Sequence, residues 1–214
     1  YEDINESIES LDEPYSDPSV VPSFILAKEI SKHYKVAMSG DGGDELLGGY
    51  TRIFKSLKKN GNIKNALSKS YYLYPAVFGT GNMLLSKSSN LEMRYRSFLE
   101  DQKLLKLLKI SSNKYSFANN LYQKDNDSYK KLLLADYKFY LSEMMMLKVD
   151  RTSMFNSLEV RSPFVDHRLI EYIISRSSDY IEPTNPKKIL KDVISDDFDK
   201  EFLNRKKMGF VFDI

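Results

Sequence analysis

The stretch VAMSGDGGDELLGGY, residues 36–50, is the part of the sequence that most clearly indicates the fold class. A short apolar run leads directly into a loop that holds more than half of the chain's nine glycines. Ahead of it, prolines and an apolar rhythm predict a helix over about 19–34, and the apolar run predicts a buried strand at about 36–39. Helix, strand, glycine-rich loop and further helix is the order of an α/β unit whose ligand lies at the carboxyl end of the strand.

The loop combines glycines with the acids Asp41, Asp44 and Glu45. Glycines after a strand let backbone N–H groups approach an anion, and a helix start favours negative charge. The loop is not a Walker A phosphate-binding loop, because no Gly-Lys-Ser/Thr follows, and its glycine spacing is not the GxGxxG of dinucleotide-binding loops. Its acids also do not fall at the positions of an EF-hand calcium loop. Carboxylates beside phosphates suit a magnesium ion between them. The alternative is a solvated turn whose acids cap the next helix.

Composition narrows the class of protein. The chain has 214 residues, enough for one domain or slightly more, and 42% of them are hydrophobic. Its 32 basic residues nearly balance 30 acidic ones, which gives no electrostatic reason to expect nucleic acid or a membrane as partner. Without cysteine there is no disulfide or thiolate chemistry. No apolar run approaches a membrane span and no signal peptide is evident, so we expect a cytoplasmic protein.

Most of the remaining chain has helical periodicity. Helices are expected near the amino terminus, over residues 1–11, and most strongly over 129–160, whereas 60–70 and 110–128 are polar and predict loops. No second strand is evident. Arg151 lies on the apolar stripe of the strong helix, so its guanidinium needs a carboxylate or an anionic ligand.

Two charged segments follow. Glu159, Arg161 and Asp166 predict a salt-bridge network that joins two helices, with Pro163 ending the first of them. Near the carboxyl end, Arg205, Lys206 and Lys207 precede Met-Gly-Phe. That cationic cluster is either a surface feature or a clamp for a leaving phosphate.

Four stretches together resemble the synthetase domain of the glutamine-dependent asparagine synthetases and the wider family that includes the β-lactam synthetases. They are LDEPYSDPSVVPSF (11–24), VAMSGDGGDELLGGYTR (36–52), DYKFYLSEMMMLKVDRTSMFNSLEVRSPFVDHRL (136–169) and RKKMGF (205–210). They occur in the order of the family, while residues 55–130 match loosely. The resemblance implies an α/β, predominantly helical fold of the adenine-nucleotide alpha-hydrolase-like, PP-loop ATP pyrophosphatase type.

The resemblance also implies a reaction: ATP adenylates a carboxylate, and ammonia then displaces AMP. For asparagine synthetase the carboxylate is the aspartate side chain, and the ammonia comes from glutamine hydrolysed in an amino-terminal domain. Ser39 and Gly40 would contact ATP, Asp44 would hold Mg²⁺, and Asp41 would face the ammonia and the acyl group. Lys207 matches the lysine that stabilises charge on the departing pyrophosphate.

The departures indicate a fragment. The family's Ser-Gly-Gly-x-Asp-Ser loop and the glutaminase cysteine are absent from the 214 residues. We therefore expect a partial synthetase domain, with 1–55 as the remnant of the nucleotide-binding core and 56–214 as the mainly helical part. Alone it should be inactive, and exposed apolar surface should favour self-association, for instance as a homodimer. The alternatives are a family amidotransferase or cyclase acting on another carboxylate, and a noncatalytic family member.

Overall fold

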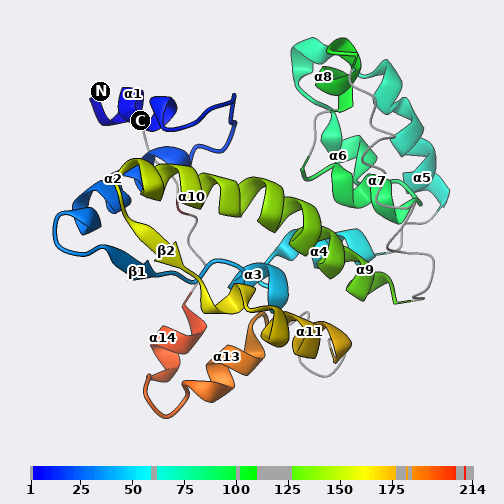
Figure 1. The fold of residues 1–214 in the computed structure, drawn as a ribbon. Coiled ribbons are helices and arrows are strands. Elements are labelled where there is room, and N and C mark those ends of the chain that lie inside the picture. The colour runs from blue at the N-terminus through cyan, green and yellow to red at the C-terminus, as the bar shows by residue number, and fades with distance from the viewer. Residues whose placement is uncertain are drawn as a thin grey trace. The chain divides into compact units, whose positions relative to one another are not determined.

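The structure is a computed structural model that describes residues 2–58, 62–99, 102–109, 127–176, 182, 185–205 and 210. Helices dominate these ranges, and two short strands form the sheet (Figure 1). The elements in chain order are α1 (Glu2–Glu9), α2 (Val20–Ser31), β1 (Val36–Met38), α3 (Gly43–Leu46), α4 (Thr51–Leu57), α5 (Asn62–Lys69), η1 (Ser70–Leu73), η2 (Ala76–Phe78), α6 (Asn82–Leu85), α7 (Leu91–Arg96), α8 (Gln102–Leu107), α9 (Ser128–Ala135), the π-helix η4 (Asp136–Met145), α10 (Met146–Phe155), β2 (Glu159–Arg161), η5 (Pro163–Val165), α11 (His167–Ser175), α13 (Lys188–Val193) and α14 (Lys200–Asn204).

The chain divides into two compact units. Unit 1 comprises Tyr1–Gly49 and Asp136–Ile214, and unit 2 comprises Tyr50–Ala135. The glycine-rich loop and both strands belong to unit 1. The candidate site is therefore described within that unit.

In unit 1, strands β1 and β2 pair in parallel, with Ala37 opposite Val160. Helix α10 packs against α2 and β2 (Figure 1). The rings of Phe24 on α2 and Phe155 on α10 lie 5.6 Å apart, and Phe24 is fully buried. Burial of such apolar side chains is the main favourable contribution to this layer.

A second apolar cluster supports the glycine-rich loop. Leu46 and Leu47, at the end of α3, are buried against Ile170 and Ile173 of α11. These α11 residues are one turn apart and so share a helix face. The cluster fixes the end of the loop on a packed helix.

Unit 2 is held together around a buried arginine. Arg94 on α7 is 5% exposed and donates hydrogen bonds to the backbone carbonyls of Ser56, Ser88 and Ser89 at 2.6–2.8 Å. Burial lowers the pKa of its guanidinium from the ordinary value. Three carbonyl acceptors satisfy donors that would otherwise be costly to bury.

The expectation of a mostly helical α/β fold with a small parallel sheet is confirmed. Helix α2 and strand β1 lie within a few residues of the expected ranges. The expectation that the strand is buried is wrong: Val36 is 45% exposed and Met38 67% exposed, because in the described residues β1 pairs only with β2. The expected helix over 129–160 is wrong at its end: it stops at Phe155, Ser157 adopts a positive φ of 55°, and β2 follows. The expected loop over 60–70 contains α5. Most of 110–128 lies outside the described residues.

Within the described ranges, no helix combines the length and apolar character that crossing a membrane requires.

Candidate functional site

The parallel pairing of the strands positions the start of the glycine-rich loop. The Ser39 N–H donates to the carbonyl of Arg161 at 2.9 Å, extending the ladder one residue past β1. The hydroxyl of Ser162, just after β2, donates to the carbonyl of Asp41. Both strands therefore deliver their carboxyl ends to one place, where α/β proteins bind ligands.

Two features leave the first part of the loop able to receive a ligand. The Ser39 hydroxyl is buried and makes no hydrogen bond with any described residue. A Cβ built at Gly40 would meet nothing within 4 Å. Because a buried hydroxyl without a partner is costly, a ligand oxygen next to Ser39 would stabilise this arrangement.

The middle glycines serve packing. Gly42 has a φ of +84°, and a Cβ there would lie 3.1 Å from Val165 Cγ1. A Cβ at Gly43 would lie 3.4 Å from the ring of Phe164. These glycines let η5 approach the loop, so their presence follows from close packing.

Asp44 is paired with a lysine from a distant part of the chain. Lys187 Nζ lies 2.7 Å from Asp44 Oδ1, and both side chains are partly buried. A Cβ at Gly49 would lie 1.7 Å from Asp44 Oδ1 and 2.8 Å from Lys187 Cε. Gly49 therefore leaves room for the ion pair, and its lack of a side chain is a requirement of this site.

The backbone of Lys187 is held against the same loop. Its φ of 58° is left-handed, and its N–H donates to the carbonyl of Leu47 at 3.2 Å. Ile189 and Leu190 of α13 pack on the Leu46–Leu47 cluster. Lys187 is not among the residues predicted from the sequence, because nothing in NPKKIL distinguishes it from Lys188. Only the turn signal of the Asn-Pro pair marks the start of a helix there.

The other two acids of the loop have different surroundings. Glu45 is 3% exposed, so its carboxyl group is shielded from bulk solvent. Asp41 is partly exposed at the end of the loop near Ser39. The helix that follows, α3, spans one turn, so its dipole adds less to anion binding than a longer helix would.

Asp44 is chemically suited to hold magnesium. Mg²⁺ prefers carboxylate oxygens and often takes one or two from the protein, with phosphate oxygens and water completing its shell. Among the described residues, no three histidine or acidic side chains converge on one point. Asp44 would therefore supply a single protein ligand, and Lys187 would have to share or release its carboxylate.

The cationic cluster near the carboxyl end is only partly described. Lys206 and Lys207 lie outside the described residues. Arg205 is exposed, and its guanidinium lies 4.5 Å from the centroid of the Phe202 ring. The role expected of Lys207 remains a prediction.

The charged residues of 147–172 form pairs. Arg151 forms an ion pair with Asp12, which supplies the carboxylate that the sequence called for. The predicted network joining two helices is wrong: Arg161 pairs with Glu159 inside β2 at 2.8 Å. Asp166 pairs with Arg168 at 2.7 Å, and these hydrogen bonds lower the pKa of the Asp166 carboxyl.

Segment 11–19 is tied to α10 by buried polar contacts. Lys148 is 3% exposed, and its ammonium lies 3.2 Å from Asp17 Oδ2 and 2.7 Å from Ser19 Oγ. Burial alone would raise the pKa of Asp17, but hydrogen bonds from Ser19 and the charge of Lys148 hold it below its usual value. Tyr15 donates to the Met144 carbonyl at 2.5 Å, and burial raises the pKa of its phenol.

Comparisons with known proteins give one family. The family model described as "Asparagine synthase" matches residues 1–213. "Asparagine synthetase (glutamine-hydrolyzing) 1" of Bacillus subtilis (strain 168) is 32% identical over 216 residues, which cover 93% of this chain and 34% of that protein. "Putative asparagine synthetase (glutamine-hydrolyzing)" of Mycobacterium tuberculosis (strain ATCC 25618 / H37Rv) is 31% identical and covers 94% of this chain and 33% of that protein.

No solved structure matches the chain significantly. The chain spans about a third of the length of the curated relatives it matches. The family model, in contrast, covers nearly the whole chain. The chain belongs to the asparagine synthase family.

Proposed function

We propose that this chain is part of an ATP-dependent ligase that converts aspartate to asparagine. Residues 1–214 would form a partial synthetase domain with a PP-loop ATP pyrophosphatase core. Within it, residues 1–55 would contribute the nucleotide-binding part and residues 56–214 the mainly helical part. The observation that carries the proposal is the carboxyl end of β1. There a buried Ser39 hydroxyl without a described partner, an open Gly40 and the carboxylate of Asp44 lie on one short loop.

The chemistry has two steps. The side-chain carboxylate of aspartate attacks the α-phosphorus of ATP, the bond to the bridging oxygen breaks, and pyrophosphate leaves. Ammonia then attacks the acyl carbon, loses a proton and displaces AMP. In the parent protein the ammonia would come from glutamine hydrolysed in an amino-terminal domain, and the protein would act in the cytoplasm.

Each residue has a distinct task in this scheme. Ser39 and the Gly40 backbone would contact the nucleotide, and Asp41 would face the acyl group and the ammonia. Asp44 would hold Mg²⁺, and the bound ion would neutralise part of the negative charge on the phosphates. Lys207 would stabilise the charge that moves onto pyrophosphate, an effect that favours the transition state over the ground state.

Lys187 adds a second cation to this scheme. Its ammonium already lies at the Asp44 carboxylate, and its backbone is fixed to the loop. If Asp44 held a metal ion, the Lys187 ammonium would be able to bind a phosphate oxygen from the backbone position that it already has. A preorganised cation of this kind lowers the cost of charge transfer to a leaving group.

Pyrophosphate release tests the proposal. It is measured with ATP, Mg²⁺, aspartate and ammonium, for the 214-residue chain and for a chain extended upstream through the next glycine-rich loop. We expect aspartate-dependent release from the extended chain alone, because the 214 residues do not contain the family's Ser-Gly-Gly-x-Asp-Ser loop. Release only with a different acid would assign another carboxylate substrate. No release from a folded extended chain, together with no binding of ATP by calorimetry, would contradict the proposal.

A further inference from the structure

Unit 2 is strongly basic, although the charge of the whole chain is nearly balanced. Residues 50–135 carry 16 of the 32 lysines and arginines but only 5 of the 30 acidic residues, a formal charge of +11. The stretch 46–91 contains no aspartate or glutamate at all. A domain with this charge attracts anionic partners, for which the total charge of the chain gives no reason.

The acid-free stretch also exposes large apolar side chains. Four of them, on the short 3₁₀ helices η1 and η2, are between 72% and 85% exposed: Tyr72, Leu73, Val77 and Phe78. Single exposed apolar residues are common, but a group of large ones indicates a surface that meets a partner.

Contacts between rings and a cation join part of this group into one surface. The ring of the buried Tyr71 lies 5.5 Å from the ring of Tyr72. The ring of Tyr74 lies 6.5 Å from that of Phe78, and the Tyr74 hydroxyl donates to the Phe78 carbonyl at 3.0 Å. Lys103 of α8 connects the two pairs, because its ammonium lies 5.2 Å from the centroid of the Tyr71 ring and 4.8 Å from that of Tyr74.

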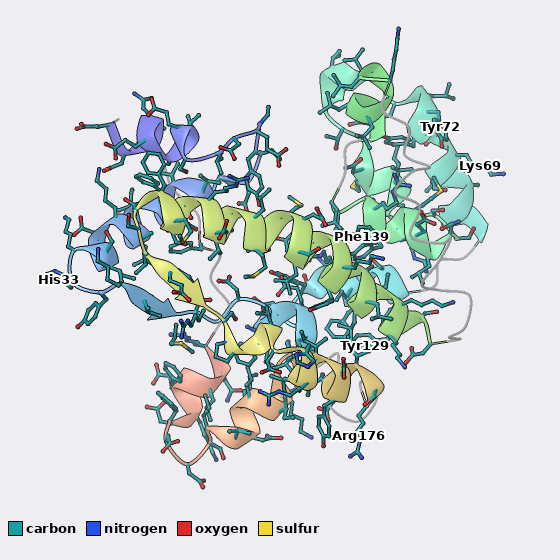
Figure 2. All side chains as sticks on the ribbon, viewed as in Figure 1. His33, Lys69, Tyr72, Tyr129, Phe139 and Arg176 are labelled. Atoms are coloured by element: carbon teal, nitrogen blue, oxygen red, sulfur yellow. The ribbon has the colours of Figure 1, made fainter. Side chains whose placement is uncertain are left out.

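Lys69 adds a second cation to this surface. It ends α5 in helical geometry and directly precedes η1. Side chains three residues apart eclipse in a 3₁₀ helix, so the exposed Lys69 lies on the same face as Tyr72 (Figure 2). We define the aromatic–basic surface as Lys69, Tyr72, Tyr74, Phe78 and Lys103.

We propose that the aromatic–basic surface binds the headgroup region of an anionic membrane, as a peripheral contact. Aromatic rings favour the boundary between acyl chains and water, where a phenol keeps its hydroxyl hydrated. Lysine side chains can lay their stems on apolar groups while the ammonium stays at anionic headgroups. Leu73 and Val77, which neighbour the surface in sequence, supply exposed aliphatic groups that fit acyl chains.

Other partners use these groups less completely. A second copy that presented the same surface would bring like charges together. Single-stranded nucleic acid stacks its bases on aromatic rings, but arginine is the residue that binds its phosphates in a bidentate manner. The arginines of unit 2 are engaged within the chain: Arg94 is buried, Arg96 pairs with Glu92, and Arg52 lies over the Tyr50 ring.

Co-sedimentation of the 214-residue chain with lipid vesicles is the first test. The anionic vesicles are phosphatidylcholine with about one lipid in three replaced by phosphatidylglycerol, and pure phosphatidylcholine is the reference. We expect binding at least about tenfold stronger to the anionic vesicles, and weaker binding at 1 M salt, where the screening length falls to about 3 Å. Equal binding to both vesicles, or no binding to either, would overturn the proposal. Binding of a single-stranded oligonucleotide without binding of vesicles would assign the surface to nucleic acid instead.

Two variants test the surface itself. A lysine near an anionic membrane strengthens binding about fivefold, so Lys69→Glu should weaken binding to the anionic vesicles by at least that factor. The double variant Tyr72→Ser, Phe78→Ser should weaken it at least about tenfold, because apolar side chains that enter the headgroup region are lost. Both rings are exposed, so the fold should be kept, and circular dichroism checks this.

The matched control is Tyr34→Ser with Lys35→Glu, an exposed aromatic residue and an exposed lysine side by side in unit 1. It should leave vesicle binding unchanged. Undiminished binding in both surface variants, or an equal loss in the control, would show that another part of the chain binds the membrane and would overturn the proposal. Vesicle binding needs neither ATP nor turnover, so its outcome is independent of the proposed function.

Discussion

Lys187 Nζ lies 2.7 Å from Asp44 Oδ1, and the glycine at position 49 leaves the space that this pair occupies. The carboxylate comes from the loop after β1, and the ammonium comes from the start of α13. The pair therefore joins two parts of unit 1 that the sequence places far apart. It also neutralises the acid that we propose as the magnesium ligand.

Replacement of Lys187 by methionine tests the role of this pair. Because both side chains are partly exposed, we expect the loss of stability to be about 1 kcal/mol at most. In an active extended chain, pyrophosphate release should fall about 100-fold, since a cation near the departing charge is lost. Thermal unfolding and pyrophosphate release measure the two effects.

Lys188→Met is the matched control for that change. Lys188 is the next residue and forms an exposed salt bridge with Glu182 at 3.1 Å. Its replacement should leave both turnover and the melting temperature nearly unchanged. Equal turnover in the two variants would show that Lys187 has no part in the reaction.

Gly49→Ala should disrupt the pair sterically. The new Cβ would lie 1.7 Å from Asp44 Oδ1, so the carboxylate must rotate away from Lys187. Crowding of this kind typically costs about 1–3 kcal/mol. We expect a lower unfolding free energy in urea. An unchanged value, with the pair intact by crystallography, would contradict this steric argument.

Gly40→Ala should behave differently, because no atom of the chain lies within 4 Å of the position that the new methyl group would take. We expect the unfolding free energy to stay within about 0.5 kcal/mol of the original. If Gly40 approaches the nucleotide, the methyl group should weaken ATP binding measured by calorimetry on the extended chain. Unchanged ATP affinity would place the nucleotide elsewhere.

The sequence predicts those parts of the site that depend on neighbouring residues. The strand β1 and the loop after it are recognisable because an apolar run, glycines and acids follow one another within 36–50. The strand β2 is not recognisable, because Glu159 and Arg161 flank a single apolar residue inside a segment of helical periodicity. Its strand geometry comes from pairing with β1, a contact between distant segments.

The sequence also does not show which side chains pair with each other in the folded chain. A sequence shows that Arg151 requires a counter-ion, but not that Asp12 supplies it. It shows three acids in a loop, but not that Glu45 turns inward while Asp44 meets Lys187. It also gives the total charge without showing how folding divides that charge between two units.

Lys148→Met should destabilise unit 1 strongly. The ammonium is buried, and its loss leaves Asp17 without its cation. Removing one member of a buried pair costs about 3 kcal/mol or more. Lys32→Met is the control, because Lys32 pairs with Glu29 at an exposed position and should contribute under about 1 kcal/mol. Equal effects in urea unfolding would show that the buried contact is absent.

Asp17 should make the stability of unit 1 depend on acid pH. Its pKa in the folded chain lies below the value of about 3.9 expected when unfolded. The unfolded chain therefore takes up the proton first as pH falls, so the stabilisation is complete above about pH 5 and is lost as pH drops through the folded-state pKa. Asp17→Asn removes this group while keeping its size.

Melting temperatures between pH 7 and pH 3 measure this effect in the original chain and in Asp17→Asn. Other carboxyl groups with lowered pKa, such as Asp3 and Asp166, titrate in both proteins and cancel in the comparison. The stability difference between the two proteins should therefore shrink as pH falls below about 4. Parallel curves over the whole range would show that the Asp17 carboxylate is not stabilised by Ser19 and Lys148.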